Sequence, residues 1–156
     1  MRWAAALLLA GVTAATAACT GAEGPPPRPS SVPSSVPPTT ATLTAADPAA
    51  ASRHDPQAQA TGVRLEVTTI VNPQGQALAL SVDLAADGAT GPPVEVGRVS
   101  PYPSDRGGVF PLPLRDEGLR LARTVPVVLT VRVAPVAAGE ALRDDVRVEV
   151  TVSLVT

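Results

Sequence analysis

From residue 62 to residue 156 this chain contains no cysteine, histidine, lysine or tryptophan. A Ser–His or Cys–His pair would therefore lack its base or its thiol nucleophile. Zinc, copper and haem sites would lack imidazole or sulfur ligands, and no glycine-rich phosphate loop is present. We therefore predict a protein that is not an enzyme and holds no metal or cofactor. The single histidine, His54, precedes this region, and we expect it to be a solvated residue of a spacer.

Aromatic residues and clustered basic charge are also scarce. Aromatic residues make up 2% of the chain, and only Tyr102 and Phe110 lie beyond residue 62, too few to line a sugar-binding cleft. The region 62–156 carries nine arginines against eleven acidic residues, interleaved along the sequence. Because a nucleic-acid-binding protein shows a clustered basic face, we predict no nucleic-acid partner. The frequent Ala, Val, Pro, Arg and Gly are typical of a GC-rich genome, such as that of an actinomycete.

The first 18 residues have the layout of a secretory signal peptide. Arg2 supplies a short positive region, and residues 4–12 form an apolar run followed by small residues. A membrane-spanning helix needs about 20 apolar residues, whereas this run is shorter and ends in a segment broken by Gly11 and Thr13. We therefore predict export, with the segment 1–18 removed.

Cys19, the only cysteine, directly follows Ala17 and Ala18. This arrangement resembles the lipobox of bacterial lipoproteins, and the resemblance implies that Cys19 becomes the new N-terminus and carries a diacylglycerol. The protein would then be attached to the outer face of the cytoplasmic membrane, because two acyl chains give stable attachment. The alternative is an ordinary signal peptide cut after Ala17, which leaves a secreted protein with a free thiol at Cys19.

Residues 19–61 are rich in Pro, Ser, Thr and Ala, with nine prolines between residues 20 and 61. Few apolar side chains are available there to offset the entropy of ordering the segment. We predict a disordered, semi-stiff tether; the alternatives are a docking site for a proline-reading partner and a glycosylated stalk. Within this segment, Asp47 followed by Pro48 fits the start of one or two turns of helix.

From Gly62 onward, apolar and polar residues alternate with a period of two, which is typical of strands with one buried face. The alternation is clearest at 63–67, 78–84, 127–133 and 146–154, and weaker strands fit at about 94–99, 109–114 and 119–123. Turn-forming residues separate these segments. Residues 62–156 are thus predicted to form an all-β sandwich of about seven strands. The pattern resembles that of immunoglobulin-like and fibronectin-III-like domains in size and strand number.

Two prolines locate one of these strands within its sheet. Pro111 and Pro113 alternate with Phe110, Leu112 and Leu114, so the missing N–H donors all lie on one lateral side of the strand. The prediction is an edge strand whose outer side resists further pairing, while its large apolar residues face the core.

Tyr102, Arg120 and Arg123 are the candidate interface residues. Tyr102 lies between Pro101 and Pro103, the arginines are predicted on the outer face of a short strand, and both residue types often dominate interfaces. The alternative role for Tyr102 is to cover the end of the core. We predict a non-enzymatic cell-surface lipoprotein that presents a small β-sandwich as an interaction module to an unidentified envelope or extracellular protein.

The alternative function belongs to a different class. Acidic residues occur in or near turns around Asp83, Asp105 and Asp144, and a secreted or anchored accessory factor would use such loops to bind a cation or a small ligand. Calcium needs six to eight converging oxygens, and the spacings here match no calcium-loop pattern.

Overall fold

The computed structural model describes residues 38–156 of the chain. The predicted signal peptide, Cys19 and the first part of the predicted tether lie outside the described residues. The described part contains eight strands and one helix: β1 (Thr39–Thr44), β2 (Ala49–His54), β3 (Gly62–Val71), β4 (Leu78–Ala86), β5 (Val94–Val99), β6 (Gly108–Pro113), α1 (Asp116–Thr124), β7 (Val127–Pro135) and β8 (Arg147–Val155). No helix within residues 38–156 is long and apolar enough to cross a membrane.

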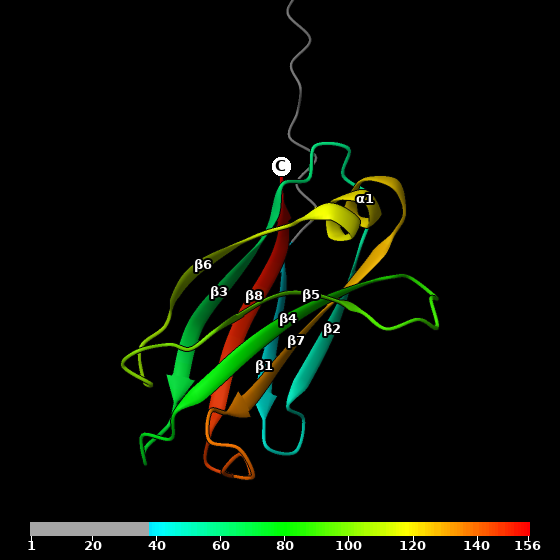
Figure 1. Cartoon of the computed structure of the whole chain (residues 1–156). Coiled ribbons are helices and arrows are strands. Elements are labelled where there is room, and N and C mark those ends of the chain that lie inside the picture. The colour runs from blue at the N-terminus through cyan, green and yellow to red at the C-terminus, as the bar shows by residue number, and fades with distance from the viewer. Residues whose placement is uncertain (1–37) are drawn as a thin grey trace, which may run out of the picture. The chain divides into compact units, whose positions relative to one another are not determined.

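The strands form two antiparallel four-stranded sheets that face each other (Figure 1). One sheet has the order β1-β8-β3-β6, and the other has the order β2-β7-β4-β5. Only the β4–β5 connection stays within a sheet, and every other connection between consecutive strands crosses to the opposite sheet. This order is that of an eight-stranded jelly roll.

The prediction of an all-β sandwich is confirmed. The order of its strands is that of a jelly roll, rather than that of the immunoglobulin-like domains that the strand number and patterning resemble. The physical reason is that a period of two indicates which face of a strand is buried. It carries no information about which strand lies beside it.

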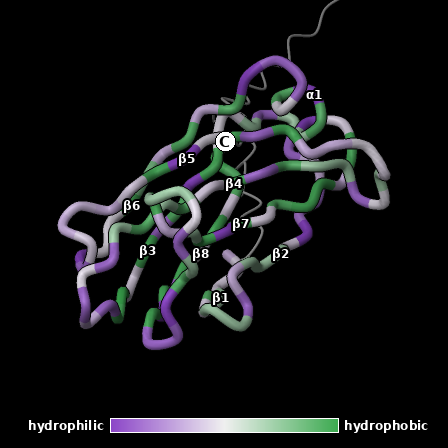
Figure 2. The backbone as a smooth tube through the Cα atoms, turned by 60° about the horizontal axis from the view of Figure 1, so that its bottom comes forward, coloured by the Kyte–Doolittle hydropathy of each residue, from purple (hydrophilic) through white to green (hydrophobic). Residues whose placement is uncertain are grey.

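The core lies between the sheets and consists of the inward-facing residues of the strands. In the four segments with the clearest alternation, every inward-facing residue up to Val152 has an exposed fraction of at most 4%. Figure 2 shows the same alternation of hydrophobic and hydrophilic residues along the strands. Among the predicted inward residues of these four segments, only Leu154 is partly exposed. The predicted register of these strands is confirmed.

The predicted boundary between tether and domain at residue 61 is wrong, because residues 39–54 supply two strands of the sandwich. β1 pairs with β8 and β2 pairs with β7, so each adds an edge strand to one sheet. β1 consists mainly of Thr, and half of the residues of β2 are Ala. Their hydrophobicity is too low for a pattern-based prediction, and their position depends on backbone pairing with strands far along the chain.

The helix considered after Asp47 is also absent from the described structure. Asp47 lies in the turn between β1 and β2, where its carbonyl oxygen accepts a hydrogen bond from Thr44 N at 2.9 Å. The alanines that follow Pro48 belong to β2. Pairing with β7 outweighs their helix propensity.

The segment 119–123, predicted as a strand, is part of helix α1. Gly118 and Ala122 are its buried residues, four positions apart on one face. A Cβ atom added to Gly118 would lie 3.1 Å from Leu114 Cδ2, so glycine allows close approach of the helix to Leu114, the residue that follows β6. Leu119 and Leu121 fit an alternating pattern as well as a helical one, because five residues are too few to separate the two periods.

The edge-strand prediction for 109–114 is confirmed. Among the strands of residues 38–156, β6 is the last of its sheet and pairs with β3 alone. Leu114 N donates to Thr61 O at 3.1 Å on the β3 side, which directs the nitrogen atoms of Pro111 and Pro113 to the outer side. The large apolar residues of this segment pack on the core, as predicted: Phe110, Leu112 and Leu114.

Candidate functional site

Tyr102, the aromatic candidate for an interface, is 96% exposed. It lies in the loop between β5 and β6, next to Pro101, which is buried. Asn72 Nδ2 donates to Ser104 O of this loop at 3.2 Å. Tyr102 therefore does not cover the end of the core, and its side chain projects from an anchored loop.

Arg120 and Arg123 lie on α1 and not on a strand. Arg120 Nη2 is 3.2 Å from Glu117 Oε1, in an exposed ion pair one turn apart, a type that contributes little to stability. Arg123 Nε donates to Ala60 O at 2.9 Å and ties α1 to the segment before β3. Strand β6 separates α1 from the loop of Tyr102, so the structure does not bring the three candidates together.

The three acidic positions of the alternative function are also dispersed. Asp83 lies on β4, where its Oδ2 is 3.6 Å from Arg132 Nε. Asp105 and Asp144 are exposed in the β5–β6 and β7–β8 loops. Among residues 38–156, no group of three or more His, Cys, Asp or Glu side chains is placed to hold a metal ion.

A buried polar cluster, which the sequence pattern did not indicate, supports the loop of Tyr102. Asn72 and Gln76 are each 7% exposed, and Asn72 Oδ1 accepts a hydrogen bond from Gln76 N at 2.9 Å. Gln76 Nε2 donates to Ala141 O at 2.9 Å, and Gln76 Oε1 accepts from Arg143 N at 3.2 Å. Together with the bond to Ser104, these contacts join the β3–β4, β5–β6 and β7–β8 loops and satisfy buried backbone groups.

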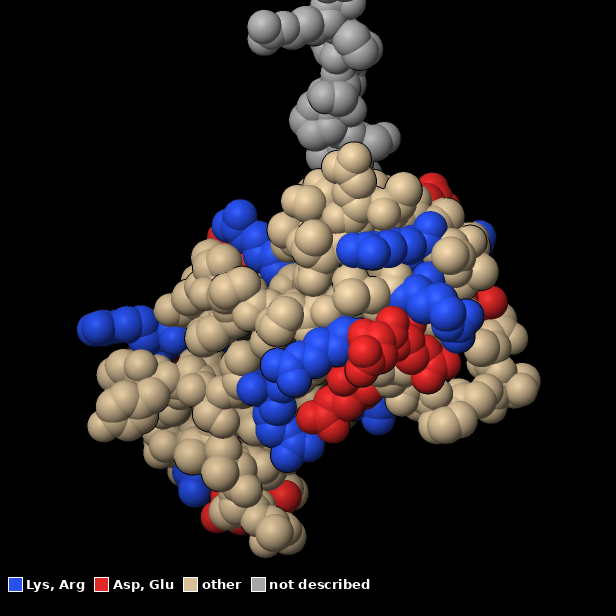
Figure 3. All heavy atoms as spheres, turned by 45° about the horizontal axis from the view of Figure 1, so that its top comes forward, with Lys and Arg blue, Asp and Glu red and all other residues tan. Residues whose placement is uncertain are grey.

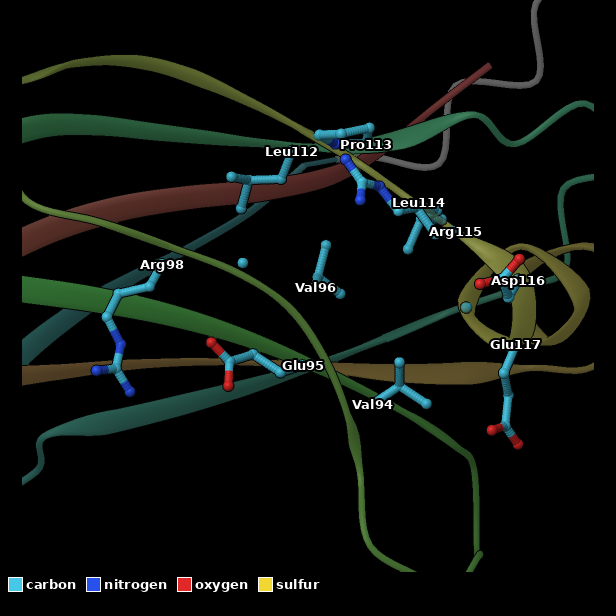
Figure 4. Close-up of a pocket in the computed structure, with 12 residues that line it drawn as sticks. Val94, Glu95, Val96, Arg98, Leu112, Pro113, Leu114, Arg115, Asp116 and Glu117 are labelled. Carbon is cyan, nitrogen blue, oxygen red and sulfur yellow. The ribbon is translucent and has the colours of Figure 1, made fainter.

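A groove of about 580 Å³ opens between β5 and β6, which are edge strands of opposite sheets. Its apolar lining includes Val94 and Val96 from β5, Leu112 from β6, and Leu114, which follows β6 (Figure 4). The charged part of the lining comes from β5 and the start of α1: Glu95, Arg98, Arg115, Asp116 and Glu117. Figure 3, in which the α1 end of the molecule comes forward, shows acidic and basic side chains gathered side by side.

The prediction that His54 is solvated is wrong, because its side chain is 1% exposed. His54 Nε2 lies 2.9 Å from Ser52 Oγ, and both residues are buried on the inner face of β2. The other ring nitrogen, Nδ1, has no hydrogen-bond partner in the described structure. Burial lowers the pKa of His54 below its ordinary value of 6.5, and the nearby charge of Asp55 opposes this effect.

We expect His54 to make the stability of the domain depend on pH. Well above pH 6.5 the imidazole is neutral in the folded and the unfolded chain. As the pH falls through 6.5, the unfolded chain binds the proton first, because the folded-state pKa is lower. The free energy of unfolding then falls, by at most about 1.4 kcal/mol per pH unit, until the pH passes the folded-state pKa. Urea unfolding at neutral and mildly acidic pH should show a larger loss for the wild type than for His54→Gln; equal losses would contradict this.

No protein-family model matches the chain, and no curated protein matches it in sequence. Three solved structures with a similar fold come from infectious bursal disease virus. The Gt strain structure matches with a TM-score of 0.33 and 16% identity, the VP2 subviral particle with 0.31 and 15%, and the Gx strain structure with 0.25 and 16%. Each match covers 76% of this chain and 33% of the viral chain. The chain thus spans about a third of the length of the chains it matches, and the likeness concerns the fold alone.

Proposed function

We propose that this protein is a non-enzymatic, lipid-anchored module of the cell surface that binds a partner protein through an exposed aromatic loop. The signal-like segment 1–18, with Cys19 directly after it, supports export and anchoring. Because β1 begins at Thr39, residues 20–38 separate the sandwich from Cys19. This segment spans about 60 Å when extended at ~3.1 Å per residue, so the sandwich is presented close to the membrane.

The observation that carries the binding role is the exposure of Tyr102. Burying a large apolar side chain stabilises a fold by about 1.5–3 kcal/mol, and at 96% exposure Tyr102 contributes almost none of this to folding. Tyrosine has few rotatable bonds and is enriched among residues that dominate interfaces. A lone aromatic side chain on a loop anchored by Asn72 is suited to fill a pocket on a partner.

Anchoring is tested at Cys19. Cells fed labelled palmitate should label the wild-type protein and not Cys19→Ala, because the thiol is the only site for the thioether-linked diacylglycerol in this chain. The wild type should fractionate with membranes, whereas the variant should be released or remain unprocessed. Equal labelling of the two proteins would refute the lipid anchor.

Partner binding is tested with Tyr102→Ala. Envelope proteins captured by the wild type should be lost or bound at least about tenfold more weakly, since a central hot-spot residue contributes about 2 kcal/mol or more. The melting temperature should not change, because the side chain is 96% exposed.

The matched control for this test is Val136→Ala. Val136 is another exposed large hydrophobic residue, 55% exposed, in the β7–β8 loop. It should leave both capture and melting unchanged. Capture that survives Tyr102→Ala, or that is lost equally with Val136→Ala, would rule out the aromatic loop as the binding surface.

A further inference from the structure

The two edge strands beside the groove differ in their capacity to pair with another strand. The outer side of β6 has Pro111 and Pro113, which lack N–H donors, so a ladder cannot extend there. β5 contains no proline between Val94 and Val99. It is therefore the side of the groove at which a further strand can add.

Hydrogen bonds at the two ends of β4 establish which of its backbone groups face β7. Ala77 O accepts from Val136 N at 2.9 Å, and Asp87 N donates to Pro126 O at 2.8 Å. The β4–β7 register is continuous between these two positions. Because lateral direction alternates along an antiparallel strand, the odd-numbered residues of β4 direct their backbone groups to β7 and the even-numbered residues direct theirs to β5.

The residues of β5 that face away from β4 follow from this alternation. The even-numbered residues of β4 are paired as Leu80↔Val99, Val82↔Gly97 and Leu84↔Val94. Glu95 and Arg98 are paired with odd-numbered residues of β4, so their N–H and C=O groups point outward from the sheet edge. These two residues are the hydrogen-bonding positions of the open edge.

A β-bulge places the side chains of these two residues on the same face. Residues three apart in a regular strand lie on opposite faces, but the register shifts between Val82 and Asp83, and Glu95 and Arg98 are both exposed. Figure 4 shows the two side chains extending to the same side of β5. Neither makes an ion pair within residues 38–156.

The charges along β5 are self-complementary. Its sequence is Val-Glu-Val-Gly-Arg-Val, so a two-fold axis between Val96 and Gly97 places Glu95 of one copy opposite Arg98 of another, and the reverse. Within its own sheet Glu95 is paired with Asp83, whose carboxylate lies 3.6 Å from Arg132 Nε. Arg132 thus serves Asp83, and an arginine on the open side of Glu95 would supply Glu95 with a cationic partner of its own.

We propose that β5 is a homodimerisation edge, at which a second copy of this chain adds its own β5 in antiparallel orientation. The dimer is isologous. Backbone hydrogen bonds join Glu95 to Arg98 of the second copy on both sides of the axis, and two cross-strand ion pairs fix the register. An extended segment of another protein is the competing occupant. The second copy is favoured because it presents the opposite charge at both open positions.

Sedimentation equilibrium of the chain from Thr20 to Thr156, which retains every described strand, tests the proposal. The wild type should show a concentration-dependent monomer–dimer equilibrium. Glu95→Arg and Arg98→Glu should each raise the dissociation constant about tenfold or more, because two attractive cross-strand pairs become two repulsive ones. Each variant should keep the melting temperature of the isolated monomer, since both side chains are exposed.

Mixing the two variants distinguishes this edge from any other interface. One variant carries two arginines at the edge and the other carries two glutamates, so only the mixture should form a dimer of wild-type strength. A chain that carries both substitutions, Glu95→Arg and Arg98→Glu, should associate with itself again. A wild type that stays monomeric at its highest soluble concentration, single variants that still dimerise, or a mixture that does not dimerise would each overturn the proposal.

Discussion

A chain that begins at Gly62 is expected not to fold, whereas a chain that begins at Pro38 should unfold cooperatively at the midpoint of the longer protein. The shorter chain loses β1 and β2, and with them one strand of each sheet. Strand β8 then becomes an exposed edge where it pairs with β1 in the full domain, and β7 becomes one where it pairs with β2. Circular dichroism melting of the two chains measures the difference.

The magnitude follows from what the removed residues 38–61 bury. Leu43 on β1 and Ala60 before β3 have no exposed surface, and removing a buried leucine side chain alone costs about 2–5 kcal/mol. Loss of two backbone ladders adds to this, against a total stability of roughly 5–15 kcal/mol for a typical domain. A cooperative transition at the same midpoint for the chain from Gly62 would show that β1 and β2 are dispensable.

Val150→Asp is expected to be the most damaging single substitution in β8. Val150 is 1% exposed and is paired with Ala41 on β1 and Val67 on β3. An aspartate there places an unpaired charge between the sheets, which costs several kcal/mol or forces its protonation. Urea unfolding should give a free energy of unfolding near zero for this variant.

Thr151→Asp, one residue along, is the matched control. Thr151 lies on the outer face of the sheet, where its Oγ1 is 2.9 Å from Thr40 Oγ1. It is paired with Glu66 on β3, so the added charge should cost about 1 kcal/mol or less. A larger loss for Thr151→Asp than for Val150→Asp would mean that the register of β8 is shifted by one residue.

Strands with strong alternation were predictable, because burial of one face of a strand requires an apolar residue at every second position. The final strand, with valines at every second position from Val146 to Val152, has its apolar side inward as expected. Proline chemistry was equally informative, because a missing N–H at Pro111 and Pro113 excludes a central position in a sheet. Both inferences depend on residues close together in the chain.

The features that sequence reasoning missed depend on residues far apart. Strand β2 contains only Ala, Ser, Arg and His, and its place in the sheet is determined by β7. His54 was expected to be solvated because its neighbours in sequence are polar, yet pairing with Val127 places it at the edge of the core. A buried histidine in such a segment has no local signal.

The candidate surfaces, too, combine features that local sequence indicates with features that depend on distant residues. The sequence identified Tyr102 as a lone aromatic, but its exposure depends on a loop that the distant Asn72 holds. It indicated Arg120 and Arg123 as a pair, but both lie on a helix and have different partners. Arg120 forms an ion pair with Glu117, and Arg123 donates a hydrogen bond to Ala60 O. The open edge at Glu95 and Arg98 had no sequence signal, since a β-bulge brings both side chains to one face.

By itself, the sequence determined the all-β class, the inward face of the main strands and the blocked edge at β6. Each of these follows from local chemistry, namely alternating polarity and the missing donor of proline. Only the tertiary structure decided the jelly-roll order, the inclusion of residues 39–54, the helix at 116–124 and the edge left open at β5. Those features arise from pairing between segments distant in the chain, where the identity of the neighbouring strand outweighs local propensity.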